Sequence, residues 1–132
     1  MTEDEKAIES EIKEKGLNAP RLSPNDIDSV IIGEDYHVFP GTTLTVCCLV
    51  LRNGFTVTGE SAAVSMENFD EELGRKIARS HARDKIWALE GYALRERLWN
   101  QAISGLAGQT ASGLIGVMFS DNVDNKVANG KA

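Results

Sequence analysis

Two neighbouring segments of the chain, residues 42–51 and 55–64, have the composition of β-strands. Both are rich in threonine, valine, leucine or other small apolar residues, which suit a pleated and partly buried surface. Asn53-Gly54 lies between them and supplies the positive φ angles of a type I′ turn. We therefore predict a β-hairpin here.

The predicted pairing leaves apolar side chains on both faces of this hairpin. Closing the turn with Arg52 opposite Phe55 pairs Val50 with Val57 on one face, and leucines lie on the other. An isolated two-stranded hairpin is only marginally stable in water. We expect one face to be covered by a helix of the same chain. The other needs an extra strand, for which residues 36–39 are the candidate, or a partner subunit.

Helical spacing of apolar residues follows the hairpin. Asn68, with Glu71 three residues later, forms a capping pattern and places a helix start near Phe69. The helical spacing continues to about residue 106. Gly91 either ends the helix or bends it, so the pattern predicts two long helical segments.

Two shorter helices are predicted before the hairpin. Thr2 and Glu5 form a capping-box pattern at the start of residues 2–15, whose apolar stripe is narrow, so this helix should be peripheral. Ser23 followed by Pro24 marks the start of the second helix. Strands followed by helices, without regular alternation, indicate an α+β fold. We expect an antiparallel β-hairpin or small sheet packed against long C-terminal helices, with short N-terminal helices.

Composition divides the chain into three parts. A peripheral helix is expected over 1–18, a single α+β domain over 19–106, and a glycine-rich segment with a flexible tail over 107–132. The length of 132 residues and the 42% hydrophobic share fit one small domain with a modest core.

The net charge of −6, from 14 basic and 20 acidic residues, argues against a protein that binds long nucleic acid. The N-terminus is acidic and lacks the apolar core of a signal peptide. No apolar run reaches the ~20 residues needed to span a bilayer. We therefore expect a cytoplasmic protein without a membrane partner.

A basic stripe stands out from this acidic background. Arg75, Arg79 and Arg83 follow one another in steps of four, which places them along one face of a helix. Such a ridge favours a small anion, such as a nucleotide phosphate. The alternative is a solvated surface neutralised by pairs such as Glu71–Arg75 and Glu72–Lys76. Arg79 and Arg83 have no acid four residues earlier, so such pairs do not account for them.

Two further residues complete the candidate ligand site. Phe69, at the start of the basic helix, could stack a base while the arginines hold phosphate. Arg95 could contribute from the next helix or from a second subunit. No spacing of a nucleophile and a base, no phosphate-loop lysine and no metal-binding cluster occurs. An enzyme is therefore disfavoured, and we expect no catalytic residue, metal or cofactor.

Several segments together resemble the small phage gene-49/gene-66 protein family. They include residues 19–24, 39–47, 51–61 and 85–92. The resemblance covers about residues 19–98 and implies a phage origin. The plan of a hairpin followed by helices is also similar to that of the viral Thoeris anti-defence sponge proteins. Those proteins bind cyclic ADP-ribose-type signals in pockets between subunits.

These observations support two main hypotheses. In the first, a non-catalytic phage protein sequesters a small cyclic nucleotide defence signal in the host cytoplasm, as a homo-oligomer. In the second, a phage interaction module inhibits a host protein through its acidic surface or its hairpin. The ligand site of the first hypothesis consists of Phe69, Arg75, Arg79, Arg83 and Arg95.

Overall fold

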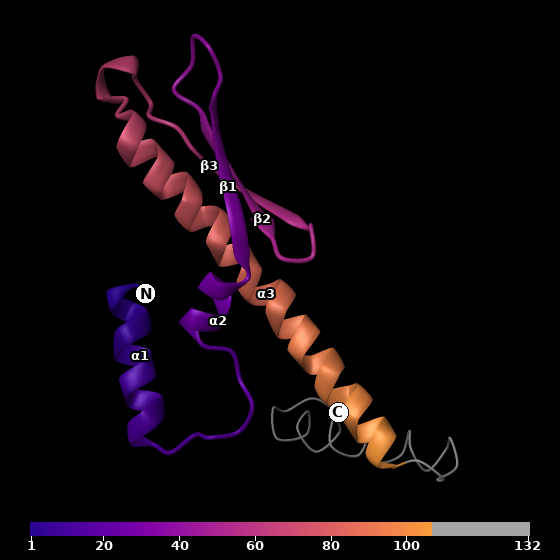
Figure 1. The fold of residues 1–132 in the computed structure, drawn as a ribbon. Helices are drawn as coiled ribbons and strands as arrows, with labels where there is room; N and C mark the ends of the chain where they lie inside the picture. The colour runs from indigo at the N-terminus through magenta and orange to yellow at the C-terminus, as the bar shows by residue number, and fades with distance from the viewer. Residues whose placement is uncertain (107–132) are drawn as a thin grey trace, which may run out of the picture. The chain divides into compact units, whose positions relative to one another are not determined.

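Figure 1 shows the computed structural model of the chain, of which residues 1–106 are described. The chain divides into two units, and the boundary falls between Leu94 and Arg95. The glycine-rich segment expected over 107–132 lies outside the described residues. The domain boundaries after residues 18 and 106 stay predictions. Among residues 1–106, no helix combines the length and apolar character needed to cross a membrane.

The predicted α+β class is confirmed: two short N-terminal helices precede the strands in the chain, and one long helix follows them (Figure 1). In chain order the elements are α1 (Glu3–Glu14), α2 (Pro24–Ser29), β1 (Ile31–Val38), β2 (Thr45–Leu51), β3 (Thr56–Ser61), the 3-10 helix η1 (Met66–Asn68) and α3 (Glu71–Gly105). Both N-terminal helices begin with capping boxes: the one at Thr2 was predicted as such, and at Ser23 the predicted serine cap also forms a box with Asp26. The two long segments predicted around Gly91 are one helix, because the glycine does not end α3.

The three strands form one antiparallel sheet in the order β1-β2-β3. The expected extra strand is therefore present, and it is longer than residues 36–39. It begins at Ile31, directly after α2. Ile32 interrupts the pairing with β2 as a bulge, and its side chain is exposed.

The predicted register of the hairpin is wrong by one residue. Leu51 N donates to Phe55 O at 2.8 Å, and Gly54 N donates to Leu51 O at 2.8 Å, so three residues form the loop. Gly54 has a φ of 89°, whereas Asn53 keeps a negative φ, and a type I′ turn would need both positive. The Asn53 side chain instead accepts a hydrogen bond from Phe55 N at 3.0 Å. This local bond favours the longer loop.

The corrected register gathers the apolar residues on one face. Leu49 pairs with Val57, not with Thr58, and both are buried. The opposite face carries one line of half-buried side chains, Val46, Cys48 and Val50 in β2, beside exposed residues of β3. Two equal apolar faces were the main motive for expecting a homo-oligomer. That expectation therefore needs other support.

The buried face of the sheet packs against the first part of α3. Small residues on the helix, Gly74, Ala78 and Ala82, follow one another in steps of four and allow the backbones to approach closely. Ala78 and Ala82 are fully buried, and Gly59 of β3 lies directly against them. Ser61 at the end of β3 donates a hydrogen bond to Gly74 O at 2.7 Å. This contact fixes α3 along the sheet and thereby places the basic stripe.

Replacing Gly54 with valine tests the turn. A β-branched side chain would be forced to a positive φ, so we expect the unfolding free energy to fall by about 1–3 kcal/mol. An added Cβ at Gly54 meets nothing within 4 Å, so any loss comes from the backbone conformation and not from a clash. Thermal melting of the variant measures the effect. An unchanged melting temperature would contradict the positive φ.

Candidate functional site

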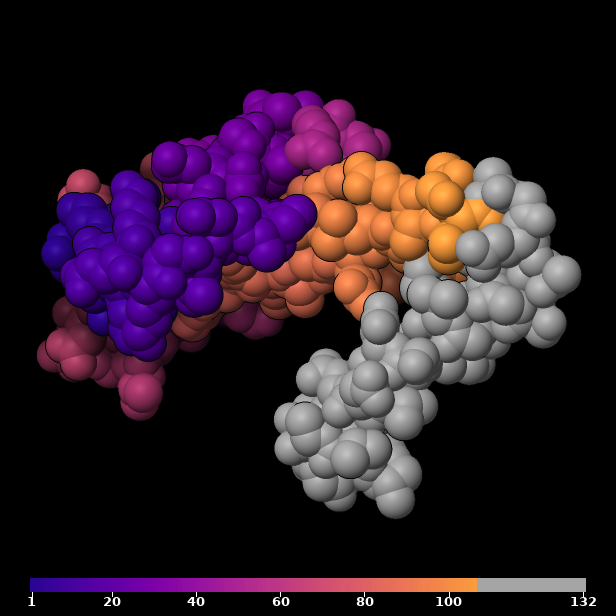
Figure 2. Space-filling model, turned by 90° about the horizontal axis from the view of Figure 1, so that it is seen from below, coloured from indigo at the N-terminus to yellow at the C-terminus, as the bar shows by residue number. Residues whose placement is uncertain are grey.

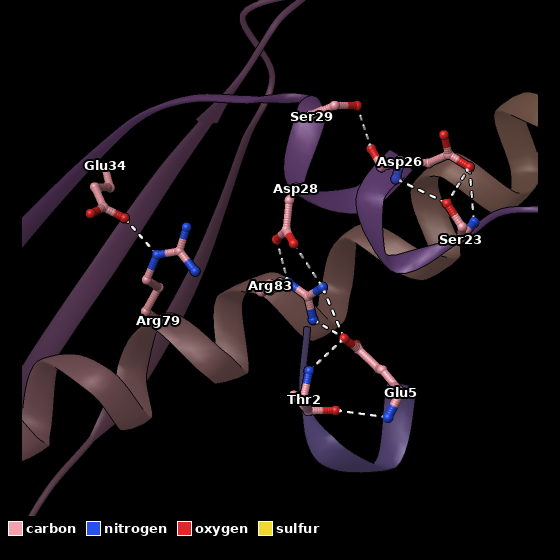
Figure 3. Close-up of polar contacts among 9 residues, drawn as sticks. All are labelled: Thr2, Glu5, Ser23, Asp26, Asp28, Ser29, Glu34, Arg79 and Arg83. Carbon is pink, nitrogen blue, oxygen red and sulfur yellow. Dashed lines mark hydrogen bonds and ion pairs between the residues drawn. The ribbon is translucent and has the colours of Figure 1, made fainter. Parts of the chain in front are cut away.

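Arg83 is the most buried member of the basic stripe, with 7% of its surface exposed. Its Nε donates to Asp28 Oδ1 of α2 at 2.7 Å, and its Nη1 donates to Glu5 Oε2 of α1 at 2.7 Å (Figure 3). Arg83 has no acid four residues earlier in the chain, as the sequence shows, but it still has two acidic partners. Its partners come from helices far away in the sequence and not from the preceding turn of its own helix.

The three charged groups stabilise one another's ionised forms. Hydrogen bonds from Arg83 lower the pKa of Glu5 and of Asp28 below their ordinary values. The pKa of Arg83 is raised above its ordinary value, mainly by its hydrogen bonds with Glu5 and in addition by those with Asp28. All three groups are therefore charged at neutral pH.

Arg79 is paired too, but it is more open. Its Nε donates to Glu34 Oε2 of β1 at 2.6 Å, and 37% of its side chain is exposed (Figure 3). The hydrogen bond to Glu34 is the main cause of its raised pKa. Within residues 1–106, its two terminal nitrogens form no hydrogen bond, so they remain available to an anion.

Arg75 lies on the exposed surface of α3. Its guanidinium is 3.4 Å from Glu71, which confirms the predicted pair, and 5.4 Å from the centre of the Tyr36 ring. Burial raises the pKa of Tyr36 to about 12. The predicted Glu72–Lys76 pair is wrong, because Lys76 forms no ion pair within the described part of the chain.

A hollow of about 490 Å³ brings part of the stripe together. It lies where the beginning of α1 and the end of α2 meet α3, and both N-terminal helices lie against α3 in the space-filling view (Figure 2). Its lining residues are Met1, Thr2, Asp28, Lys76, Arg79, Ser80 and Arg83. Three basic side chains, two hydroxyl groups and one carboxylate therefore line a space of the size that small ligands occupy.

The other predicted ligand residues lie elsewhere. Phe69 is half-buried and lines a separate hollow of about 110 Å³. This second hollow shares no lining residue with the hollow of about 490 Å³, which we call the basic hollow. Arg75 is absent from both linings. Arg95 is exposed and belongs to the second unit. A ligand-binding role for these three residues stays a prediction.

Sequence reasoning missed most of the partners of the arginines. Glu5, Asp28 and Glu34 come from three different elements, and no spacing in the sequence connects them with α3. Lys76 and Ser80 could have been found from the sequence, because each directly follows an arginine of the stripe. A helical projection that included neighbours of the stripe would have identified them.

Among residues 1–106, no group of three or more histidine, cysteine, aspartate or glutamate side chains is placed to hold a metal ion. Cys47 and Cys48 are free thiols. Burial raises the pKa of Cys47, so this thiol stays protonated at neutral pH.

Comparison with known proteins gives one match. A family model described as the phage protein (N4 Gp49/phage Sf6 gene 66) family matches residues 22–98, which is more than half of the chain. The matched region begins just before α2 and includes the sheet and most of α3. No curated protein and no solved structure shows significant similarity.

Proposed function

The chain belongs to the phage protein (N4 Gp49/phage Sf6 gene 66) family, and from this premise we propose that it binds and sequesters a small cyclic nucleotide. The ligand would be a defence signal of the host, and the protein would withhold this signal from the host's defence effector in the cytoplasm. The protein would act without catalysis, metal or cofactor.

The observation that carries this proposal is the way Arg79 is held at the basic hollow. Glu34 takes only the Nε side of its guanidinium, so the orientation of the group is fixed while its terminal nitrogens stay open. Lys76, without an ion pair among residues 1–106, lines the same hollow together with the hydroxyl group of Ser80. An oriented guanidinium beside a free ammonium group suits a phosphate or pyrophosphate group.

The size and charge of the hollow narrow the ligand class. About 490 Å³ matches a small nucleotide, whereas long nucleic acid is disfavoured by the net charge of −6. The order of a hairpin followed by helices in the sequence resembles that of anti-defence sponge proteins, and this resemblance is the reason for choosing a cyclic nucleotide within the class. No arrangement of an acid and a base at the hollow supports turnover of the ligand.

A second candidate function is supported by a different surface. Phe55, Leu89 and Tyr92 are exposed to 55%, 37% and 71%, and the first two line a hollow of about 210 Å³. Clustered apolar side chains of this kind favour contact with another protein. Inhibition of a host protein would use this surface, and so would a homo-oligomer of the chain.

We expect Arg79→Ala and Lys76→Ala each to weaken binding of a cyclic nucleotide. Each removes a charge-assisted contact worth roughly 1.5–3 kcal/mol, so affinity should fall by about tenfold or more. Arg79→Lys should retain only part of the affinity that Arg79→Ala loses, because an ammonium group lacks the planar, two-pronged donor geometry of a guanidinium. Calorimetry against a panel of cyclic dinucleotides, cyclic trinucleotides and cyclic ADP-ribose isomers measures these affinities.

Lys85→Ala is the matched control. It removes a lysine from the same helix, at an exposed position outside the hollow, and should leave the affinity unchanged. Mass spectrometry of the nucleotide released by denaturation should recover it chemically intact. If no panel member binds, and a host protein is captured instead in a manner that depends on Phe55 and Tyr92, the second function replaces the first.

A further inference from the structure

Helix α1 is attached to the rest of the first unit mainly through charged groups. None of its residues is buried, and Ile8 is 55% exposed. Two of its glutamates, one turn apart, each contact a guanidinium. Glu5 binds Arg83 at 2.7 and 3.2 Å, and Glu9 binds Arg21 at 2.8 and 2.9 Å. Because little apolar surface holds α1, its attachment depends on these contacts.

The two carboxylates bound to Arg83 occupy different sides of its guanidinium. Asp28 takes the Nε side, with Nε–Oδ1 at 2.7 Å and Nη2–Oδ2 at 3.4 Å. Glu5 takes the terminal edge, where its two oxygens accept from Nη1 and Nη2 (Figure 3). Asp28 and Arg83 lie within the family match, whereas Glu5 lies before it. The family portion alone therefore orients Arg83 and leaves its terminal edge open.

That terminal edge is the part of an arginine that binds phosphate with two parallel hydrogen bonds. The Glu5 carboxylate occupies it as an anion with two acceptor oxygens. Arg83 also lines the basic hollow, together with Arg79 and Lys76. A phosphate group that entered the hollow would therefore compete directly with Glu5 for the same donors.

The start of α1 depends on the same carboxylate. Thr2 N donates to Glu5 Oε1 at 3.0 Å, and Glu5 N donates to Thr2 Oγ1 at 3.0 Å, which closes the capping box. Met1 and Thr2 also line the hollow. Displacement of the Glu5 side chain would therefore loosen the first turn of α1 and open one side of the hollow.

We propose that Glu5 is an intramolecular competitor for the anionic ligand, and that a phosphate group binding to Arg83 releases α1. The proposal rests on the proposed function in that it takes the basic hollow as the ligand site. It adds a regulatory contact: α1 keeps the site partly closed and neutralised until a phosphorylated ligand displaces Glu5.

The test uses the full-length chain and inorganic pyrophosphate as the probe. Glu5→Gln should raise the affinity for pyrophosphate about threefold to tenfold, because the amide competes less well for the guanidinium than a carboxylate does. Glu3→Gln is the matched control. It removes the same charge from the same turn, but the Glu3 side chain is 89% exposed and pairs with Lys6, so affinity should change less than about twofold.

Hydrogen exchange gives the second measurement. Saturation of the unmodified chain with pyrophosphate should speed amide exchange in Glu3–Glu14, while the strands keep their protection. Glu5→Gln should show fast exchange in α1 even without pyrophosphate, and circular dichroism should show that the remaining structure is retained.

Three results would contradict the proposal that Glu5 competes with the ligand for Arg83. They are equal pyrophosphate affinities of Glu5→Gln and Glu3→Gln, unchanged exchange in α1 on saturation, and no pyrophosphate binding by either the unmodified chain or Glu5→Gln. If a cyclic nucleotide binds with the expected dependence on Arg79 while exchange in α1 stays unchanged, only the competitor is rejected. The proposed function then stands.

Discussion

Gly59→Ala should lower the unfolding free energy by about 3 kcal/mol or more, which corresponds to a fall in melting temperature of roughly 10–25 °C. A Cβ at Gly59 would lie 2.2 Å from the Ala78 carbonyl oxygen and 2.3 Å from the Ala82 amide nitrogen. Both atoms belong to the backbone of α3, so no side-chain rotation relieves the clash. The strand and the helix must move apart, and the fully buried contacts of Ala78 and Ala82 are then lost.

Gly33→Ala is the matched control for this prediction. It makes the same substitution in β1, where the added Cβ would lie 3.8 Å from Val50 Cβ, an ordinary contact. Both substitutions change the entropy of the unfolded chain equally. Gly33→Ala should therefore alter stability by less than about 1 kcal/mol. Thermal melting followed by circular dichroism compares the two, and equal melting temperatures would rule out the close crossing of β3 and α3.

The type and order of the secondary structure elements could be predicted because local patterns determine them. The capping box at Thr2, the serine cap at Ser23, the strand composition and the helical spacing of apolar residues are each set by residues close together in the chain. Gly91 misled the prediction because the cost of a helical glycine, about 1 kcal/mol relative to alanine, is small beside the helical preference of the residues around it. A single unfavourable residue does not end a helix of 35 residues.

The register of the hairpin depends on a choice that composition does not settle. Asn-Gly suits a two-residue type I′ turn, but it also suits a three-residue loop in which only the glycine has a positive φ. Gly59 could have decided the question. It pairs with Cys47 on the buried face, and a glycine in a strand often marks close approach of another backbone. Placing Gly59 against the small residues of the helix, on the same face as Leu49 and Leu51, requires the observed register.

The basic stripe was correctly placed on one helix, but its chemical state could not be predicted. Each arginine has a different environment, because different elements pack against α3 at each position. Arg83 was buried between Glu5 and Asp28, Arg79 was held on one side by Glu34, and Arg75 stayed on the surface. These partners lie 45 to 78 residues away in sequence. Only the three-dimensional arrangement shows which donors of each arginine are already paired and which are open.

Arg83→Met should lower the unfolding free energy by about 2–3 kcal/mol at pH 7. Removing one partner of a buried ion pair leaves the opposite charge without compensation, which costs about 3–5 kcal/mol when the pair is fully buried. The expected loss is smaller here because the Asp28 side chain is 41% exposed and regains water. Arg75→Met is the matched control. The Arg75 side chain is 51% exposed, so its loss should cost less than about 1 kcal/mol.

The pH dependence of stability identifies the ion pairs as the source of this difference. Arg83 holds the pKa of Glu5 below its ordinary value of 4.5 and that of Asp28 below 3.8. The stability that these depressed values provide is present above the ordinary values, and it is lost as pH falls through the folded-state values. Urea unfolding should therefore show a large gap between the unmodified chain and Arg83→Met at pH 7, and a narrower gap near pH 3. A gap of constant size would assign the loss to packing of the arginine stem and not to its charge.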